Sequence, residues 1–327
     1  MWALSGVEGR VDGGRIEIRM NVVVLMSTWQ GERLVQEQLR SILDQLPVGG
    51  RVIVRDDGST DRTVARIQEL KDSRIAVIRG PNVGFVRSFF KLLDIAPDDA
   101  DVIMLSDQDD VWLPNKIERA ATHLAPMRDT PALYCSRLRL VDERLLPLGL
   151  SPKWERPPSF RNALTENIVT GCTCAINRAA LPLARQYGDP GRIYFHDWWL
   201  YLVIAAFGQV IVDREPTILY RQHGTNAIGM GSGAGRYLAI LRFLRKKNWI
   251  HIMYEQIENF RAVHGAQLRA DHRRLLDSYF DCQRPLTAMR LLITPVRFRQ
   301  SLMGDVLLRL LLLGSWITGR GFLSRPR

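Results

Sequence analysis

The chain has 327 residues and a net charge of +11, and its hydrophobic content of 46% is typical of a globular protein. The excess charge is confined to one end. Residues 1–235 hold 28 basic and 28 acidic side chains, whereas residues 236–327 hold 17 and 6. Four cysteines are too few for a disulfide framework and favour a reducing compartment. The basic end lacks a nucleic-acid recognition motif, so we expect no nucleic-acid partner.

The first nineteen residues differ in character from the rest of the chain. They are rich in glycine and charge, and they lack the apolar core of a signal peptide. Met20 lies directly before the first strong strand. We therefore interpret residues 1–19 as a loose extension, or as the result of an upstream start codon.

From residue 20 the sequence alternates between predicted strands and helices. Apolar runs predict strands at 21–26, 51–55, 75–78 and 102–105, and those at 21–26 and 102–105 are expected to be buried. Segments with helical spacing separate them at 32–46, 61–70 and 85–93. This order predicts an α/β fold with a parallel sheet and right-handed crossovers. Neither a dinucleotide-binding glycine fingerprint nor a P-loop is present, which argues against both of those classes.

Polar residues follow each predicted strand at its carboxyl end. Such ends meet at one edge of a parallel sheet, where ligands bind. Asp107, Asp109 and Asp110 directly follow the fourth strand. Carboxylates this close repel one another unless they are compensated, and hard oxygen ligands suit Mg²⁺ or Mn²⁺. The sequence thus predicts a metal and an anionic substrate at this edge, with a solvated acidic turn as the alternative.

Seven short motifs occur in a fixed order between residues 20 and 228. They are Val-Val-Leu-Met-Ser-Thr-Trp (23–29), Asp-Asp-Gly-Ser-Thr-Asp (56–61), Asn-Val-Gly (82–84), Ser-Asp-Gln-Asp-Asp-Val-Trp (106–112), Thr-Gly-Cys-Thr (170–173), His-Asp-Trp-Trp (196–199) and Tyr-Arg-Gln-His-Gly-Thr-Asn (220–226). With these motifs the region resembles family 2 glycosyltransferases of the GT-A fold. The fourth, sixth and seventh motifs are most similar to the rhamnosyltransferase-type branch.

The resemblance implies that a nucleotide-sugar donor lies across the strand tips. Ser27, Thr28 and Trp29 would contact the nucleotide, and Asp57 the base or ribose, with an ordinary turn residue as the alternative for Asp57. Asn82 and Gly84 complete the donor contacts. Asp107 would face the ribose or the metal, and Asp109 would bind Mg²⁺ or Mn²⁺ directly. Asp110 could replace Asp109, because the sequence does not fix the register.

The second half of the region is expected to build the acceptor side. There the resemblance implies that Asp197 is the general base that removes the acceptor hydroxyl proton. A single displacement with one base implies inversion at the anomeric carbon. The alternative for Asp197 is a helix N-cap. His196 and Trp198 are expected to contact substrate.

The seventh motif adds two further candidates. Arg221 is expected to contact phosphate, and His223 is expected to approach the metal or the diphosphate. For the Cys172–Cys174 pair we favour buried structural thiols over half of a metal site, because no matching pair completes such a site.

Residues 236–327 mix arginine and lysine with large apolar side chains. The longest apolar run, at 306–317, is shorter than the ~20 residues of a membrane span. We expect this region to bind an anionic membrane surface, with apolar contacts near Trp249 and Trp316. The alternative is a helical bundle with a solvated basic face that packs on the catalytic domain.

Together these features predict a GT-A domain at 20–235 and a basic helical region at 236–327. The predicted activity is an inverting, metal-dependent transfer from a nucleotide-sugar, with dTDP-rhamnose the leading candidate, to a glycan or lipid-linked acceptor. The predicted location is the cytoplasmic face of the inner membrane. The alternatives are a sugar nucleotidyltransferase, whose Gly-rich, Arg/Lys-bearing loop is missing after the first strand, and a non-catalytic membrane scaffold, which would have lost the carboxylates.

Overall fold

The computed structural model describes residues 11–12, 15–16, 20–222, 249–280 and 285–317. The chain divides into two compact units. Unit 1 comprises Met1–Lys153, Val169–Arg185 and Gly208–Gly229, and unit 2 comprises Trp154–Ile168, Gln186–Phe207 and Met230–Arg327. Each unit is therefore built from segments that are separated in the sequence.

Unit 1 is built around one sheet of nine strands. In chain order these are β3 (Val22–Thr28), β4 (Arg51–Asp56), β5 (Ile75–Arg79), β6 (Val102–Ser106), β7 (Val111–Trp112), β8 (Ala132–Val141), β9 (Pro147–Leu150), β10 (Ala175–Asn177) and β11 (Gln209–Arg221). The strands lie in the order β5-β4-β3-β6-β10-β8-β11-β7, and β9 pairs with β8. A separate hairpin pairs β1 (Val11–Asp12) with β2 (Arg15–Ile16).

The first half of the sheet has the predicted parallel arrangement. β3 pairs in parallel with β4 and with β6, and β4 pairs in parallel with β5. The second half is mixed, because β10 runs antiparallel between β6 and β8, whereas β8 and β11 are parallel. The sheet is thus mostly parallel in the half that carries the strand-tip motifs, and the predicted α/β fold is confirmed.

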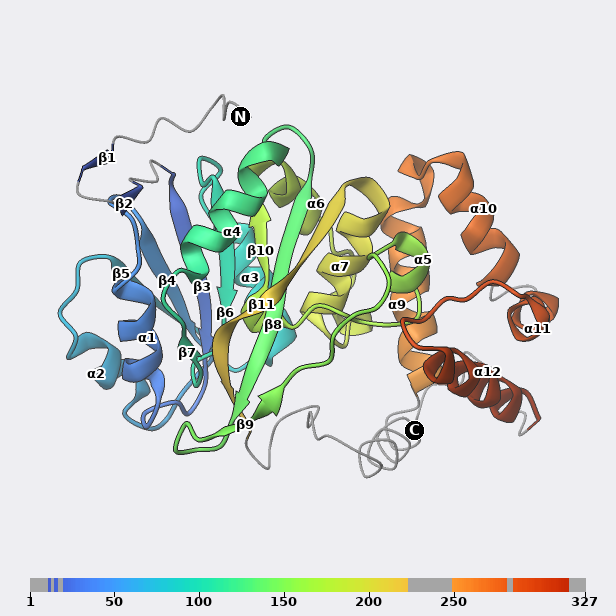
Figure 1. The fold of residues 1–327 in the computed structure, drawn as a ribbon. Helices are drawn as coiled ribbons and strands as arrows, with labels where there is room; N and C mark the ends of the chain where they lie inside the picture. The colour runs from blue at the N-terminus through green and yellow to red at the C-terminus, as the bar shows by residue number, and fades with distance from the viewer. Residues whose placement is uncertain (1–10, 13–14, 17–19, 223–248, 281–284, 318–327) are drawn as a thin grey trace. The chain divides into compact units, whose positions relative to one another are not determined.

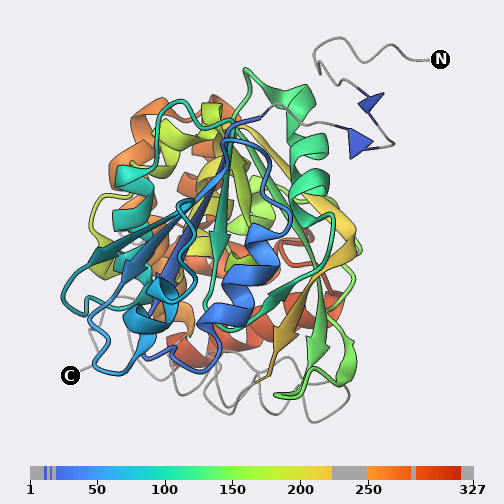
Figure 2. The ribbon, with the colours of Figure 1, turned by 90° about the vertical axis from the view of Figure 1, so that its left-hand side faces the viewer.

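Helices cover both faces of this sheet (Figures 1 and 2). The helices of unit 1 are α1 (Val35–Leu43), α2 (Thr63–Gln68), α3 (Phe85–Ile95), α4 (Lys116–Leu124) and α6 (Leu181–Ala184). Short 3-10 turns are η1 (Ala125–Met127), η2 (Gly171–Thr173) and η3 (Arg178–Ala180). Right-handed crossovers place α1 and α2 on one face and α3 on the other. Residues 22–26 of β3 are fully buried, as a strand between two helical layers requires.

Unit 2 is helical. Its elements are α5 (Phe160–Ala163), η4 (Pro190–Arg192), α7 (His196–Phe207), α9 (Trp249–His264), η5 (Gly265–Gln267), α10 (Ala270–Tyr279), α11 (Pro285–Ile293) and α12 (Leu302–Ile317). Helix α7 is apolar on almost every side and forms the core, where Trp199 meets the edge of Phe260. Trp198 stacks on Trp249 with ring centroids 4.7 Å apart.

The packing in unit 2 groups two segments of the predicted catalytic region, 154–168 and 186–207, with the C-terminal helices. The boundary predicted at residue 235 stays a prediction, because it lies outside the described residues. Within the described ranges, none of the helices combines the length and the apolar content that a membrane span requires.

Candidate strand-tip active site

The ends of β3 and β6 are joined through the side chain of Gln108. Its Oε1 accepts from the backbone N–H of Trp29 at 2.9 Å, and its Nε2 donates to the carbonyl of Trp29 at 2.9 Å. Gly31 makes this approach possible, because a Cβ there would lie 2.2 Å from Gln108 Oε1. The paired bonds place the Asp107–Asp109 turn beside the first strand tip. The sequence analysis did not predict a role for Gln108. Its position between Asp107 and Asp109 could have suggested one.

The second strand tip is organised by the buried carboxylate of Asp57. Its two oxygens accept the backbone N–H groups of Val83 and Gly84 at 2.9 Å each. The guanidinium of Arg55 binds the same carboxylate and also donates to the carbonyl of Pro81 at 3.0 Å. Gly84 adopts a φ of +83°, which favours glycine. In this structure Asp57 therefore shapes the 80–84 turn, and its proposed contact with a base or ribose stays a prediction.

The remaining candidates at these tips differ in exposure. Trp29 is 54% exposed and Asn82 is also exposed, so both offer contact surface. Thr28 is buried, and its hydroxyl donates to Asp56 at 3.3 Å. Ser27 shares a 2.7 Å hydrogen bond with the buried hydroxyl of Ser88. These contacts fix the backbone at the end of β3, where the donor is expected.

The carboxylates after β6 form a cluster that includes a cysteine. One ligand atom from each of Asp107, Asp110 and Cys172 lies within 4.8 Å of the others. Asp110 is buried, and its Oδ1 accepts the backbone N–H of Arg221 at 3.1 Å. Its Oδ2 is also buried and has no hydrogen-bond partner in the described part of the chain. Burial, followed by the charges of Asp109 and Asp107, raises the pKa of Asp110 well above its ordinary value.

These residues fit a hard divalent cation. A buried carboxylate oxygen without a partner, next to two further carboxylates, is the kind of ligand set that Mg²⁺ and Mn²⁺ favour. Burial also raises the pKa of Cys172, so the thiol stays protonated and is a poor ligand beside the oxygens. His223 lies outside the described residues.

A lysine lies buried beneath this cluster. The Nζ of Lys116 lies 4.8 Å from the centre of the Trp112 ring and donates to Thr217 at 3.4 Å. Burial lowers the pKa of Lys116 to about 8. Its charge offsets part of the negative charge of the carboxylates above it. Sequence reasoning missed Lys116, because nothing in its local pattern distinguishes it from a surface lysine.

Arg221 reaches the cluster through its backbone. Its guanidinium is buried, pairs with Glu37 and donates to the carbonyl of Glu143 at 2.6 Å. Its backbone N–H binds Asp110. In this structure Arg221 therefore positions the carboxylate, and the expected phosphate contact stays a prediction.

The acceptor-side candidates stand at the start of α7 in unit 2. Asp197 is half-buried in the first turn, and its carboxylate accepts the backbone N–H of Trp198 at 2.7 Å. His196 is buried, and this burial lowers its pKa to about 3, so its ring is neutral. Trp198 is fully buried, and its indole N–H donates to the carbonyl of Ala163 at 2.7 Å. This burial gives Trp198 a packing role and leaves Asp197 as the accessible group.

The amino-acid sequence is similar to those of known proteins. A model of the glycosyl transferase family 2 matches residues 23–181. A dTDP-rhamnosyl transferase, RfbG of Shigella flexneri, is 31% identical over 223 residues, which cover 62% of this chain and 73% of the relative. This chain belongs to glycosyl transferase family 2. It is an enzyme of the glycosyltransferase class, similar to a rhamnosyltransferase.

Other similar proteins agree with the family. WfgD of Escherichia coli, a UDP-Glc:alpha-D-GlcNAc-diphosphoundecaprenol beta-1,3-glucosyltransferase, is 29% identical over 187 residues, covering 56% of this chain and 69% of the relative. TarS 1–349 of S. aureus in complex with UDP-GlcNAc has a TM-score of 0.54 at 14% identity, with 92% of both chains covered. The mannosyltransferase PcManGT of Pyrobaculum calidifontis, in complex with GDP-Man and Mn2+, has a TM-score of 0.50 at 14% identity, covering 94% of this chain and 88% of that one. These two likenesses show the fold, and they agree with the GT-A architecture predicted from the sequence.

Proposed function

We propose that this enzyme transfers L-rhamnose from dTDP-rhamnose to a hydroxyl of a lipid-linked glycan, with inversion at the anomeric carbon. One observation carries the donor side of the proposal: the carboxylates after β6 are held against Trp29 at the tip of β3 by the paired bonds of Gln108. This is the edge of the sheet where a nucleotide is expected. The similarity to a dTDP-rhamnosyl transferase supports the choice of sugar.

A divalent cation, Mg²⁺ or Mn²⁺, is part of the proposal. Asp109 and Asp107 would hold it, and the buried Oδ2 of Asp110 would be a further ligand on the same turn. Such a cation supplies Lewis-acid stabilisation of the charge that develops on a diphosphate leaving group. Gln108 fixes the turn, and the backbone N–H of Arg221 fixes Asp110. His223 is proposed as a further contact of the metal or the diphosphate.

Asp197 is proposed as the general base. It is the accessible carboxylate at the start of α7, and the N–H of Trp198 fixes one of its oxygens. An aspartate of ordinary basicity works mainly through position and through stabilisation of the charge as the proton leaves. His196 and Trp198 hold this turn of α7 in the core, which supports Asp197 indirectly.

The acceptor is proposed to be a glycan carried on a lipid diphosphate, in line with the acceptor in the name of the relative WfgD. A membrane contact would accompany such an acceptor, and α12 supports it. Side chains of α12 at helical spacing are between 37% and 67% exposed, and all are apolar: Leu302, Met303, Val306, Leu310 and Leu313. The opposite side of α12 is already packed through Leu308 and Leu312.

A solvated helix carries polar side chains on its outer face, so the outer face of α12 suits the interfacial layer of a membrane. Trp249 is buried and stacks on Trp198, so its side chain is not available to a membrane. The apolar membrane contact is therefore proposed for α12 instead of the Trp249 neighbourhood. The side chain of Trp316 lies outside the described residues. The location proposed is the cytoplasmic face of the inner membrane.

The donor is tested with a panel of nucleotide-sugars. We expect release of dTDP from dTDP-rhamnose, in the presence of a lipid-linked glycan acceptor, at a rate well above that with UDP-glucose, UDP-GlcNAc and GDP-mannose. NMR analysis of the product then gives the anomeric configuration, which should be inverted relative to the donor. Faster turnover with any other donor would refute rhamnose as the sugar, and retention would refute the single displacement.

A further inference from the structure

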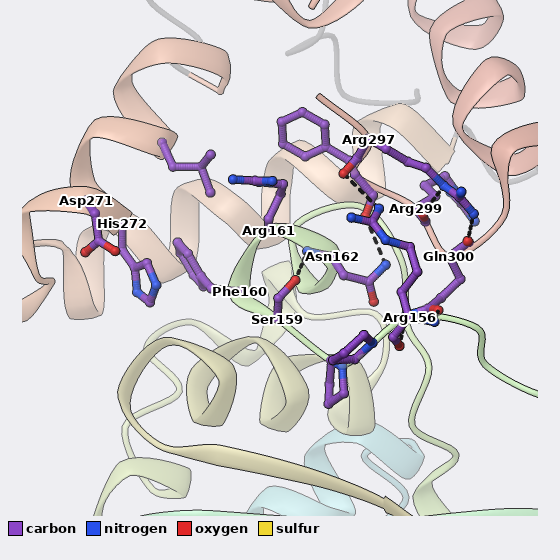
Figure 3. Close-up of a pocket in the computed structure, with 14 residues that line it drawn as sticks. Arg156, Ser159, Phe160, Arg161, Asn162, Asp271, His272, Arg297, Arg299 and Gln300 are labelled. Atoms are coloured by element: carbon purple, nitrogen blue, oxygen red, sulfur yellow. Dashed lines mark hydrogen bonds between the residues drawn. The ribbon is translucent and has the colours of Figure 1, made fainter. Parts of the chain in front are cut away.

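Unit 2 contains a pocket of about 390 Å³ that no part of the proposed chemistry uses. Residues 156–162 line one wall, residues 297–300 line another, and α10 contributes Asp271, His272 and Leu275 (Figure 3). Its volume lies within the range of small-molecule sites, roughly 300–1,000 Å³. Four of the lining residues are arginines, at positions 156, 161, 297 and 299.

Backbone carbonyls hold three of these arginines in place. Arg156 donates to the carbonyl of Arg297 at 3.2 Å, Arg297 donates to the carbonyl of Arg299 at 3.1 Å, and Arg299 donates to the carbonyl of Thr165 at 3.0 Å. Carbonyl oxygens orient a guanidinium but leave its full charge uncompensated. The arrangement therefore preorganises positive charge at one end of the pocket.

The nearby carboxylates compensate only part of this charge. Asp271 accepts hydrogen bonds from Nε and Nη2 of Arg269, at 2.7 and 2.5 Å. Glu166 binds Arg299 at 3.4 Å, and the largely exposed Glu155 lies 3.6 Å from Arg297.

The guanidiniums of Arg156 and Arg161 face no carboxylate in the described part of the chain. The Nε of Arg299 is buried and also has no hydrogen-bond partner among the described residues. Like charges held this close repel one another, so the pocket favours an anion.

The other end of the pocket has a different character. Phe160 and His272 stack there with ring centroids 4.4 Å apart, opposite the arginines, and Arg161 lies between the two ends (Figure 3). The pocket wall at Gln300 is followed two residues later by Leu302, where the exposed apolar face of α12 begins. A ligand with an anionic group attached to an apolar chain would fit an arginine-lined pocket that continues into an apolar helix face.

We propose that this pocket binds the diphosphate of the lipid-linked acceptor, an inference that rests on the lipid-linked glycan of the proposed function. Guanidinium forks match phosphate oxygens in pairs, and several arginines around one pocket suit two linked phosphates better than one. The pocket is concave, and three of its four arginines are held in place by backbone carbonyls. A membrane of anionic phospholipid needs only a flat basic surface, so the structure favours the acceptor over bulk lipid.

The test uses the full-length protein and farnesyl diphosphate as the probe, with binding measured by calorimetry. Arg161→Gln removes a guanidinium that has no hydrogen bond or ion pair among the described residues, so the fold loses no polar contact there. We expect Arg161→Gln and Arg156→Gln each to weaken binding about tenfold, the value of one charge-assisted hydrogen bond. Arg290→Gln is the matched control, because Arg290 is an exposed arginine of α11 outside the pocket. Binding of farnesyl diphosphate to Arg161→Gln at wild-type affinity, or equal losses in Arg161→Gln and Arg290→Gln, would overturn the proposal.

A second experiment distinguishes the diphosphate of a lipid-linked acceptor from the phosphate of bulk phospholipid. Co-sedimentation with phosphatidylglycerol vesicles should decrease equally for Arg161→Gln and Arg290→Gln, since each removes one charge from the basic surface. A selective loss of vesicle binding in Arg161→Gln, with farnesyl diphosphate binding intact, would assign the pocket to bulk phospholipid and overturn the inference. Calorimetry measures binding without sugar transfer. The pocket can therefore be tested even if the enzyme uses a donor other than dTDP-rhamnose. Conversely, an enzyme that transfers rhamnose but does not bind farnesyl diphosphate refutes only the pocket.

Discussion

Unit 1 and unit 2 each gather like charges at one place, and the charges have opposite signs. In unit 1, Asp107 and Asp110 meet beneath the strand tips, close to Asp109. In unit 2, four arginines line one pocket. Each cluster is unfavourable by itself, because like charges repel more strongly where water is scarce. The two proposals accordingly place a cation in unit 1 and an anion in unit 2.

The two clusters also differ in how the chain assembles them. The carboxylates of unit 1 come from one short turn, so a single strand end delivers them together. The arginines of unit 2 come from two segments, whose contact between Arg156 and Gln300 spans 144 residues. Local assembly makes the first cluster visible in the sequence, whereas only the tertiary packing creates the second. Substitutions in both units test this contrast, from the largest expected effect to the smallest.

The sharpest test concerns Asp197, the one acidic group of unit 2 that is assigned to catalysis. Asp197→Asn keeps an oxygen for the N–H of Trp198 but cannot accept a proton. We expect turnover to fall about 10²–10⁴-fold, the usual contribution of a general base, with unchanged dTDP affinity and melting temperature. Asp197→Ser should lose activity to the same extent. Wild-type-like turnover in Asp197→Ser would show that Asp197 only caps the helix and is not the general base.

The cation side of the comparison is tested at Asp109. Asp109→Asn should lower turnover about 100-fold, which corresponds to the loss of about 2.7 kcal/mol of metal-dependent stabilisation. EDTA should abolish the activity of the wild-type enzyme, and Mg²⁺ or Mn²⁺ should restore it. Asp99→Asn is the control, because Asp99 is an exposed aspartate that precedes β6 at the other end of that strand. Full activity of the wild-type enzyme after EDTA treatment would show that the acidic cluster has no metal role.

The join between β3 and β6 is tested at Gly31. Gly31→Ala places a Cβ 2.2 Å from Gln108 Oε1, so the flexible Gln108 side chain must leave the backbone of Trp29. Losing these two hydrogen bonds, each worth about 0.5–1.5 kcal/mol, should raise the KM for the donor about tenfold and should lower the melting temperature by only a few degrees. Gln108→Ala should give the same KM, and the double variant should be no worse. Gly265→Ala, whose Cβ would meet only an ordinary contact at 3.6 Å, is the control. Additive effects in the double variant would mean that Gly31 does not act through Gln108.

The smallest expected effect concerns the exposed apolar face of α12, which is proposed to contact the membrane. Leu310→Glu should reduce co-sedimentation with anionic vesicles about fivefold, because burying half of a leucine is worth about 1 kcal/mol. Binding of the wild-type protein should require anionic lipid and should weaken with salt without vanishing, because the apolar part is not screened.

Val48→Glu is the control for this variant, since Val48 is 97% exposed in unit 1. If Leu310→Glu and Val48→Glu lose vesicle binding equally, the loss comes from the added negative charge and not from the apolar face of α12. Equal and negligible binding of the wild-type protein to anionic and neutral vesicles would favour a helical region that only packs within the protein.

The strands and helices around the donor site were predictable because their signals are local. Apolar runs at 21–26, 51–55, 75–78 and 102–105 predicted β3, β4, β5 and β6, and each strand lies within two residues of its run. β3, β4 and β6 are buried between helices, whereas β5 is an edge strand and is partly exposed. The chain order also determined that the strand tips meet at one edge, because right-handed crossovers leave few arrangements. The carboxylate turn and the prediction of a cation there came from the same reasoning.

Long-range packing decided the rest. The sequence indicated that Asp107, Asp109 and Asp110 are close, but only the fold shows that Asp110 and Lys116 are both buried and that the N–H of Arg221 holds Asp110. Composition placed a boundary near residue 235, yet contacts group 154–168 and 186–207 with the C-terminal helices.

The sequence also could not show which large side chains face outward, because apolar residues serve a protein core and a membrane face equally well. The contacts of Trp249 and Leu308 settle this for the described helices: Trp249 is packed inside unit 2, and the outer side of α12 stays apolar. The arginine pocket belongs to the same class of features. Residues far apart in the chain acquire a shared environment only when the packing of α5, α10 and the 297–300 segment brings their charges together.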